Sequence, residues 1–265
     1  MHSYEFIFCR GAYANFTVTH AMNKYLRESW RIGSPIHTLY DRPPAHFRPL
    51  AADERGAFLR ANPDTQAYAE KILSGHTKLV VSATSWTADE DFSVLLGAFV
   101  EYDRRASGEN FLRPNSIPDI LAIITGKGPL RDGYIARVAE LELQYVTIKS
   151  AWLEAEDYPK MVACADLGVS LHTSSSGMDL PMKVVDMFGT GVPVAAIRYK
   201  SVWELVKEGG NGVTFETEKE LMAVLVRLFD PRKKELEILK NGAMEETKNR
   251  WDENWDKVAA PVFGM

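Results

Sequence analysis

The sequence predicts an α/β fold: a doubly wound parallel sheet with helices on both faces, as in the Rossmann-like C-terminal half of a two-domain enzyme. Two observations predict it. From residue 78 onward, short apolar segments alternate with longer amphipathic segments, which is the order of strands and helices in βαβ units. The short segments are apolar almost throughout, as expected for strands that are buried on both faces.

The expected elements follow this alternation along the chain. Strands are expected at 14–19, 36–40, 79–83, 120–125, 145–149, 167–171, 192–197 and 212–215. Helices are expected at 21–30, 66–73, 89–105, 129–143, 158–164, 181–188, 202–207, 219–229, 232–249 and 251–259. The strand at 36–40 must end before Pro43 and Pro44, because proline cannot continue a strand ladder.

These elements divide the chain into three parts. Residues 76–265 contain enough strands and helices for one complete domain, and residues 51–75 form a weakly periodic connector. Residues 1–50 hold two expected strands and one helix, which is too little for a core of their own. We therefore expect residues 1–50 to be the remnant of another α/β domain.

The composition excludes several classes of function. The chain has 265 residues and a net charge of −5, so no basic excess indicates nucleic acid as a partner. Its two cysteines, Cys9 and Cys164, are far apart, which argues against a disulfide framework or a zinc site and fits a reducing compartment. No apolar run approaches the ~18 residues of a membrane-spanning helix, and Glu5 and Arg10 interrupt any signal-peptide pattern.

Ligands of open parallel sheets bind beyond the carboxyl ends of the strands, and the first such end is at residues 82–86. Thr84 and Ser85 can place hydroxyl and backbone N–H groups against a phosphate. The next residues admit a local explanation, a capping box with Thr87 as N-cap and Glu90 three positions into the helix. Residues 89–91 also fit a D-x-D metal motif, but acidic residues are favoured in a first helical turn, so we predict capping and no metal.

The next two strand ends carry weaker signals. Gly126, Lys127 and Gly128 follow a strand, where glycines permit close approach of a ligand, with Pro129 expected to open the next helix. A tight strand-to-helix turn explains the same residues without a ligand. Trp152 follows the strand after that, and its ring can either stack on a nucleobase or pack on the following helix.

The strongest signal is the polar loop after the strand at 167–171. Small polar residues leading into a helix form a cradle for an anion, and Lys183 lies in the first helical turn, where the helix dipole disfavours a cation. A bound diphosphate would explain that lysine, and Asp186 on the same face could accept hydrogen bonds from ribose hydroxyls. A surface pair of Lys183 and Asp186 beside a helix capped by Asp179 is the alternative. The residues expected at this site are His172, Ser174, Ser175, Ser176, Gly177, Lys183 and Asp186.

Several of these segments together resemble the chitobiosyldiphosphodolichol beta-mannosyltransferases. The resemblance rests on residues 85–92 (SWTADEDF), 124–131 (ITGKGPLR), 152–159 (WLEAEDYP), 165–189 (ADLGVSLHTSSSGMDLPMKVVDMFG) and 250–255 (RWDENW), and it extends from about Phe16 to the end of the chain. It implies the GT-B fold, with the C-terminal domain binding GDP-mannose and the N-terminal, acceptor-side domain carrying a membrane anchor.

The resemblance also implies an activity and a location. Such an enzyme transfers mannose with inversion to dolichyl-diphospho-N,N′-diacetylchitobiose, on the cytosolic face of the endoplasmic reticulum membrane, where other enzymes of the dolichol-linked oligosaccharide pathway are possible partners. It implies no tightly bound cofactor and leaves a metal requirement open. The catalytic base stays unassigned, with His20 and His172 as candidates.

The sequence departs from broader GT-B enzymes in two ways. Of the pair of glutamates that they carry with seven residues between them, the second falls on Asp186 but the first falls on Met178. Their arginine and lysine for the diphosphate are missing after the first strand of the domain, which leaves Lys183, Lys127 and loop N–H groups. Compared with the family, we also expect the chain to be truncated at its N-terminus, without the anchor and nearly all of the first domain. Two alternatives therefore stay open: a truncated, non-catalytic module that binds a nucleotide sugar or a partner, and a GT-B enzyme with another donor or acceptor.

Overall fold

A parallel six-stranded sheet forms the centre of the larger part of the molecule. The computed structural model describes residues 2–108, 117–174 and 176–265. The strands are β3 (Thr77–Ala83), β4 (Asp119–Thr125), β5 (Val146–Ala151), β6 (Leu167–Ser170), β7 (Val194–Ile197) and β8 (Gly212–Phe215). Their order is β5-β4-β3-β6-β7-β8, which confirms the predicted doubly wound parallel sheet.

The strand order reverses between β3 and β6. From β3 the chain builds outward through β4 to β5, then returns to place β6 on the other side of β3 and builds outward again. Val80 and Val81 of β3 lie in register with Leu167 and Gly168 of β6. The carboxyl ends of these two central strands therefore form the crevice at which open sheets of this kind bind ligands.

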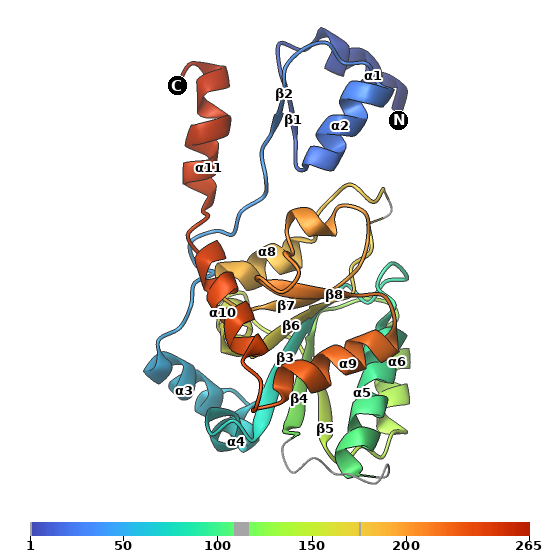
Figure 1. Cartoon of the computed structure of the whole chain (residues 1–265), viewed down its shortest axis with the longest axis vertical. Helices are drawn as coiled ribbons and strands as arrows, with labels where there is room; N and C mark the ends of the chain where they lie inside the picture. Colours follow the sequence, from blue (N-terminus) through green and yellow to red (C-terminus); the bar gives the residue numbers. More distant parts are fainter. Residues whose placement is uncertain (1, 109–116, 175) are drawn as a thin grey trace.

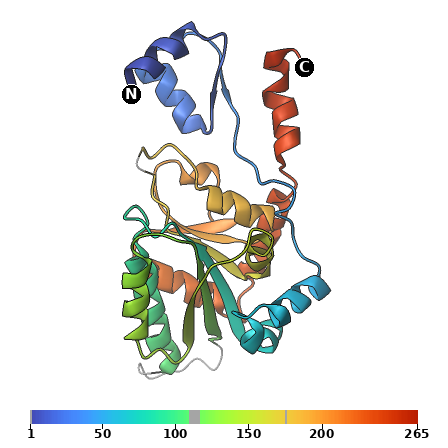
Figure 2. The same ribbon diagram turned by 180° about the vertical axis from the view of Figure 1, so that it is seen from behind.

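Helices cover both faces of the large sheet (Figures 1 and 2). One face carries α5 (Phe92–Ser107) and α9 (Glu218–Phe229), and α6 (Arg131–Ala139) follows β4. The other face carries α4 (Ala69–Leu73), α7 (Tyr158–Cys164) and α8 (Met182–Gly189), while α10 (Glu235–Glu246) contributes to both cores. Val80 lies in the first core, whereas its neighbours Leu79 and Val81 lie in the second, so the apolar strands are buried on both faces as predicted.

The first residues of the chain form a smaller unit around a second sheet. Its two parallel strands are β1 (Asn15–Thr17) and β2 (Ile36–Thr38), accompanied by α1 (His2–Gly11) and α2 (His20–Ser29). The strands and α2 were predicted, but α1 was not. In the connector, α3 (Ala52–Ala61) was not predicted either, while η1 (Gln66–Tyr68) and α4 coincide with the expected helix at 66–73.

The carboxyl terminus returns to this smaller unit. Beyond η2 (Val202–Glu204) and α10, the chain continues into α11 (Trp251–Val258) and η3 (Ala260–Phe263), which lie beside the small sheet at the same end of the molecule (Figure 1). Phe263 stacks on Phe16 of β1 with ring centroids 6.0 Å apart and on Trp255 with centroids 5.9 Å apart. Among the described residues, no helix is both long and apolar enough to cross a membrane.

Candidate functional site

An ion pair joins the two central strand ends. Lys183, in the first turn of α8, donates a hydrogen bond to Glu90, which lies in the loop between β3 and α5. Glu90 is 3% exposed, and its carboxylate also accepts hydrogen bonds from the Thr84 hydroxyl at 2.7 Å and the Ser85 N–H at 2.6 Å. The Lys183 ammonium lies 3.5 Å from the Ser85 hydroxyl. The predicted residues Thr84, Ser85 and Lys183 therefore come together at the strand reversal.

The capping box predicted for this loop is wrong. Helix α5 begins at Phe92 rather than at residue 89, and its N-cap is Asp91, which accepts a hydrogen bond from the Ser93 N–H at 3.0 Å. The buried carboxylate of Glu90 is instead paired with Lys183 and hydrogen-bonded by Thr84, as a buried charge requires. Glu90 therefore forms the ion pair with Lys183, whereas Asp91 caps α5. In the ranges 2–108, 117–174 and 176–265, no three His, Cys, Asp or Glu side chains gather to hold a metal ion.

The loop after β6 is organised by Asp179. Its carboxylate accepts hydrogen bonds from the hydroxyls of Ser174 and Ser176, and it lies 3.3 Å from Nε2 of His172. Burial opposes the ionisation of Asp179, but these hydrogen bonds outweigh it and hold the pKa of the carboxyl below its usual value. Ser175, which was also expected at the site, lies outside the described residues.

Asp179 is therefore not the helix cap that was predicted. The N-cap of α8 is Pro181, with Met182 as the first helical residue, and no side chain caps this end. Asp179 bonds to the serines of its own loop instead, because they lie three and five residues before it. Gly177 allows that loop to turn with φ of +68°. The hydroxyls of Ser174 and Ser176, which were expected to face a ligand, therefore bond to Asp179.

The two glycines after β4 let two loops pack against each other. A Cβ atom at Gly126 would lie 1.8 Å from the Thr84 carbonyl oxygen, and one at Gly128 would lie 1.8 Å from that of Ser85. The indole of Trp86 donates a hydrogen bond to the Gly126 carbonyl at 3.2 Å. Loop packing therefore accounts for these glycines without a ligand. Pro129 does not open the next helix, since α6 begins at Arg131.

Lys127 and Trp152 meet at the ends of β4 and β5. The ammonium of Lys127 lies 3.7 Å from the centroid of the Trp152 ring, a geometry that stabilises both side chains by a cation–π contact. Trp152 is 58% exposed. Its ring is therefore not packed in the core, and its open area is available to a planar ligand.

Asp186 lies one turn after Lys183 but does not pair with it. Lys183 turns to Glu90, so the predicted alternative of a surface Lys–Asp pair is wrong. Burial raises the pKa of the Asp186 carboxyl to about 7. A carboxyl with a raised pKa, one helical turn from the lysine at the strand reversal, is a candidate for ligand binding.

A second carboxylate, Glu204 of η2, connects the large domain to the small unit. It accepts hydrogen bonds from the backbone N–H groups of His20 at 2.7 Å and Ala21 at 2.8 Å, and from the Tyr40 hydroxyl at 2.6 Å. Burial and the adjacent Glu204 carboxylate raise the pKa of the Tyr40 hydroxyl, which therefore keeps its proton. Glu204 thus supplies acceptors to the first N–H groups of α2.

The two candidate bases lie in different units: His20 begins α2 of the small unit, and His172 follows β6 of the large domain. Nδ1 of His20 is 3.1 Å from the Thr38 hydroxyl, and the His20 ring meets Tyr40 edge-on. His172 lies in the loop after β6, and the Thr19 hydroxyl, one residue before His20, donates a hydrogen bond to the Met178 carbonyl of that loop. The small unit therefore touches the same loop that holds His172. The sequence contained no signal for Glu204 or Tyr40, because they are 164 residues apart.

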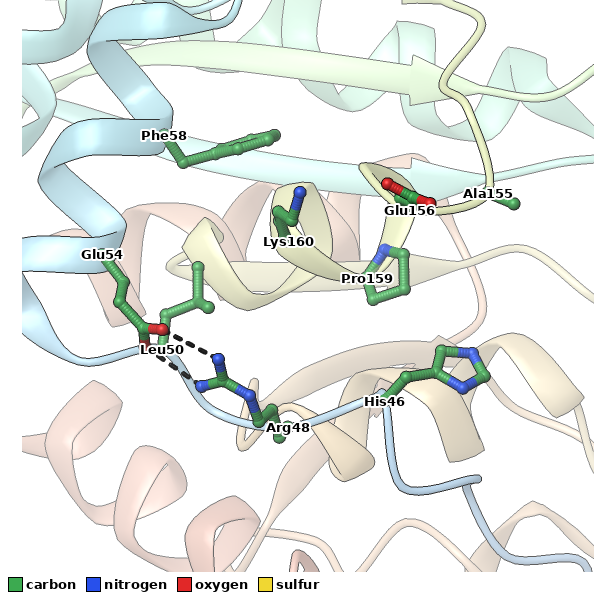
Figure 3. A pocket seen from close by; sticks show the side chains of 9 residues that line it. All are labelled: His46, Arg48, Leu50, Glu54, Phe58, Ala155, Glu156, Pro159 and Lys160. Carbon is green, nitrogen blue, oxygen red and sulfur yellow. Dashed lines mark hydrogen bonds and ion pairs between the residues drawn. The ribbon is translucent and has the colours of Figure 1, made fainter.

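A groove of the surface lies elsewhere. It has a volume of about 650 Å³ and runs between residues 46–50, α3 and the start of α7 (Figure 3). Arg48 and Glu54 form an ion pair along it, at 2.8 Å. It is lined by His46, Arg48, Leu50, Glu54, Phe58, Ala155, Glu156, Pro159 and Lys160. None of the residues expected at the donor site lines this groove, which is therefore separate from the cluster at the strand reversal.

Known proteins resemble this chain in sequence. The model of the family described as "Glycosyl transferases group 1" matches residues 64–246. Over its whole length the chain is 45% identical to a protein of Arthroderma benhamiae named chitobiosyldiphosphodolichol beta-mannosyltransferase, and it covers 60% of that relative. It is 40% identical, over 98% of its length, to the mouse (Mus musculus) protein of the same name and covers 58% of it. The chain thus spans less than two thirds of these relatives.

Solved structures resemble it in fold. Anabaena Alr3699/HepE in complex with UDP-glucose aligns over 96% of this chain and 64% of its own, with a TM-score of 0.69 and 16% identity. The pneumococcal O-GlcNAc transferase GtfA in complex with UDP and GlcNAc aligns over 99% of this chain and 47% of its own, with a TM-score of 0.67 and 14% identity. At such identities the likeness shows the fold alone, and it confirms the predicted α/β class.

Proposed function

The chain belongs to the group 1 glycosyl transferases, and from that premise we propose that it is the donor-binding part of an enzyme that moves mannose from GDP-mannose to dolichyl-diphospho-N,N′-diacetylchitobiose. The geometric observation that carries the proposal is the position of Lys183. Its ammonium lies where β3 and β6 end, at the point of strand reversal where sheets of this type bind nucleotides. The choice of mannose as the sugar and of the dolichol-linked chitobiose as the acceptor follows the names of the relatives.

In the proposed donor site, different side chains bind the diphosphate, the ribose and the base of the nucleotide. Lys183 and the exposed Ser85 hydroxyl bind the diphosphate, since a lysine ammonium is a point charge suited to phosphate oxygens. Asp186 accepts hydrogen bonds from the ribose hydroxyls. Trp152, with Lys127 on one face, stacks on the guanine. The loop around Asp179 lies next to the sugar.

The backbone of the loop after β3 contributes less to this site than the sequence suggested. The Thr84 N–H bonds to the Thr125 carbonyl at 2.9 Å, the Ser85 N–H to Glu90, and the Trp86 N–H to the Thr84 hydroxyl at 2.9 Å. These N–H groups already have acceptors within the chain. The charge for a diphosphate therefore comes from a side chain of α8.

The transfer itself is proposed to invert the sugar linkage, because the donor linkage is alpha and the product linkage beta. A single displacement then requires a base beside the acceptor hydroxyl and a positive charge beside the leaving GDP. Lys183 supplies the charge. His20 and His172 remain the candidate bases, and the contact of Thr19 with the loop of His172 places both near the junction of the two units.

Residues 1–50 are proposed to belong to an acceptor-side domain, and the whole enzyme to act at the cytosolic face of the endoplasmic reticulum membrane. These proposals rest on the relatives, whose names include a dolichol-linked acceptor. Contact with other enzymes of the same pathway is part of the proposal. No residue of the chain is assigned to it.

Calorimetry with GDP, UDP and GDP-mannose, followed by a transfer assay, tests the proposed function. We expect GDP and GDP-mannose to bind more tightly than UDP, and mannose to reach a chitobiose-diphosphate lipid when the acceptor-side domain is supplied. Absence of GDP binding at millimolar concentration would remove the donor-site proposal. Binding by this chain without transfer in any assay would leave a non-catalytic nucleotide-sugar-binding module, and preference for another donor would leave a GT-B enzyme of different specificity.

A further inference from the structure

We infer that Glu90 is a positioning residue for the donor diphosphate: it fixes the Lys183 ammonium at the strand reversal so that one of its N–H groups faces the phosphates. The inference rests on the proposed donor site and assigns a role to a residue that sequence patterns explain as helix capping. It concerns a carboxylate that lies next to the position of an anion. Such a placement needs a physical reason, because like charges repel.

Lys183 cannot hold its own position. A lysine side chain has four rotatable bonds and a strongly hydrated ammonium, and the dipole of α8 repels a cation in the first helical turn. A negative charge beside the ammonium restricts the side chain to one position and offsets the repulsion by the helix dipole. Glu90 supplies that charge from a different element, and the pair links the loop after β3 to the start of α8.

Glu90 is itself held in a fixed orientation. One of its oxygens, Oε2, accepts hydrogen bonds from Thr84 and Ser85, which leaves Oε1 toward Lys183. The loop that carries it is anchored by Trp86, which is 2% exposed and bonds to the Gly126 carbonyl. Trp86 also has a φ of +49°, an unusual value for a residue with a side chain. A strained and anchored loop is one whose surroundings determine its geometry.

The ion pair leaves part of the ammonium free for a ligand. An ammonium has three N–H donors, and among the residues that the structure describes, Glu90 and Ser85 accept hydrogen bonds from Lys183. The Lys183 side chain is 25% exposed, against 2% for the Glu90 side chain. The exposed part of the pair is therefore the cation. A diphosphate that approaches the crevice meets the ammonium first, while the buried carboxylate stays behind it.

A purely structural role for Glu90 makes a different prediction. If Glu90 only stabilised the loop, its loss would weaken every ligand of the crevice alike, including a nucleoside that has no phosphate. If it positions Lys183, its loss weakens only the ligands with a diphosphate. The ratio of GDP affinity to guanosine affinity separates the two roles.

The test is a calorimetric cycle on the full chain with GDP and guanosine as ligands. The variants are Glu90→Gln, Lys183→Met and the double variant, with Glu70→Gln as a control because Glu70 pairs with Arg60 on an exposed surface. We expect Glu90→Gln to weaken GDP binding about tenfold, as for loss of a charged hydrogen bond, and to change guanosine binding less than twofold. The double variant should bind GDP no more weakly than Lys183→Met, because the two residues act as a unit.

Three results would overturn the inference. They are equal weakening of GDP and guanosine by Glu90→Gln, tighter GDP binding by that variant, or additive losses in the double variant. Melting curves establish which variants fold. Should Glu90→Gln not fold, Glu90→Asp tests the same point, because it keeps the negative charge but withdraws the carboxylate from Lys183 by one methylene group. A selective loss of GDP affinity of about threefold or more is expected there, and an unchanged ratio of GDP affinity to guanosine affinity would refute positioning.

The same titrations distinguish failure of this inference from failure of the proposed function. A wild-type chain that binds neither GDP nor UDP refutes both. A chain that prefers UDP refutes the guanine donor only. The cycle is then run with UDP and uridine, and the same outcomes decide the role of Glu90.

Discussion

The Tyr40 hydroxyl donates a 2.6 Å hydrogen bond to Glu204, and this bond connects the chain segment after β2 with η2 of the large domain. The same carboxylate binds the first N–H groups of α2. Removal of the Tyr40 hydroxyl or the Glu204 carboxylate should therefore lower the local stability of the small unit and leave that of the large sheet unchanged.

For Tyr40→Phe we expect faster hydrogen exchange in residues 15–40 and unchanged exchange in β3 and β4. The loss of one hydrogen bond to a charged acceptor amounts to about 1.5–3 kcal/mol of local stability. Glu204→Gln should have the larger effect, because the acceptor serves three donors. Exchange measured by mass spectrometry checks this, and uniform exchange across both parts in Tyr40→Phe would contradict it.

Gly126→Ala should destabilise the protein strongly. Its Cβ would lie 1.8 Å from the Thr84 carbonyl oxygen, and its φ is +137°, so the loops must separate and the backbone is strained. We expect a loss of at least about 3 kcal/mol in the free energy of unfolding, measured by urea denaturation. Gly133→Ala is the matched control: this glycine lies within α6 with no atom within 4 Å of an added Cβ. It should stabilise the protein by about 0.5–1 kcal/mol.

Asp186 should make stability depend on pH. Its pKa is about 7 in the folded chain, against an ordinary value of 3.8. Because the folded carboxyl holds its proton more tightly, ionisation destabilises the fold as pH rises from about 4 to about 7, and the loss is complete above that. Asp186→Asn should therefore melt about 2–4 °C higher than the wild type at pH 8 and at the same temperature at pH 4. Equal melting temperatures at pH 8 would contradict the raised pKa.

Asp186 should also make nucleoside binding depend on pH if it accepts hydrogen bonds from ribose. Such bonds favour the ionised carboxylate, so guanosine should bind more tightly at pH 8 than at pH 6. The dependence should vanish in Asp186→Asn, in which no proton is released. Calorimetry in two buffers at pH 7 measures that proton directly, and a wild type without proton release would remove Asp186 from the ribose site.

Trp152→Ala should weaken GDP binding without loss of stability. Stacking of a base on an aromatic ring contributes about 1–3 kcal/mol, or about 5–150-fold in affinity. The side chain is 58% exposed, so its removal leaves no cavity in the core. Trp203→Ala is the control, since Trp203 is 66% exposed and lies in η2. Equal GDP affinity in wild type and Trp152→Ala would show that the base binds elsewhere.

The regular part of the fold could be predicted because its strands are buried on both faces and its helices are amphipathic. The helix at 158–164 has the expected bounds, and every strand of the large sheet was expected within three residues. By contrast, α3 carries few apolar residues at helical spacing, and only Gly56 and Leu59 of this helix are buried. The segment therefore lacks the hydrophobic periodicity from which a helix is predicted.

The chemistry of the site could be predicted only in part, because the decisive contacts are long-range. Lys183 was expected to need an anionic partner, but Glu90 lies 93 residues away in sequence, and its own neighbours fitted a capping box. Asp179 was assigned to the helix that follows it, whereas the serines before it compete successfully for its oxygens. Local patterns identify which side chains are polar, and only the fold decides which partners they meet.

The return of the carboxyl terminus to the small unit has a mechanical consequence. Two chain segments cross between the units, one after β2 and one before α11, and Arg250 ties them together: it donates to the Phe47 carbonyl at 2.8 Å and to the Gly189 carbonyl of α8 at 3.2 Å. Arg250 therefore fixes the two crossings to each other and to α8 at the point where both leave the large domain. Displacement of either crossing requires these hydrogen bonds to break, so the small unit is attached through both segments together.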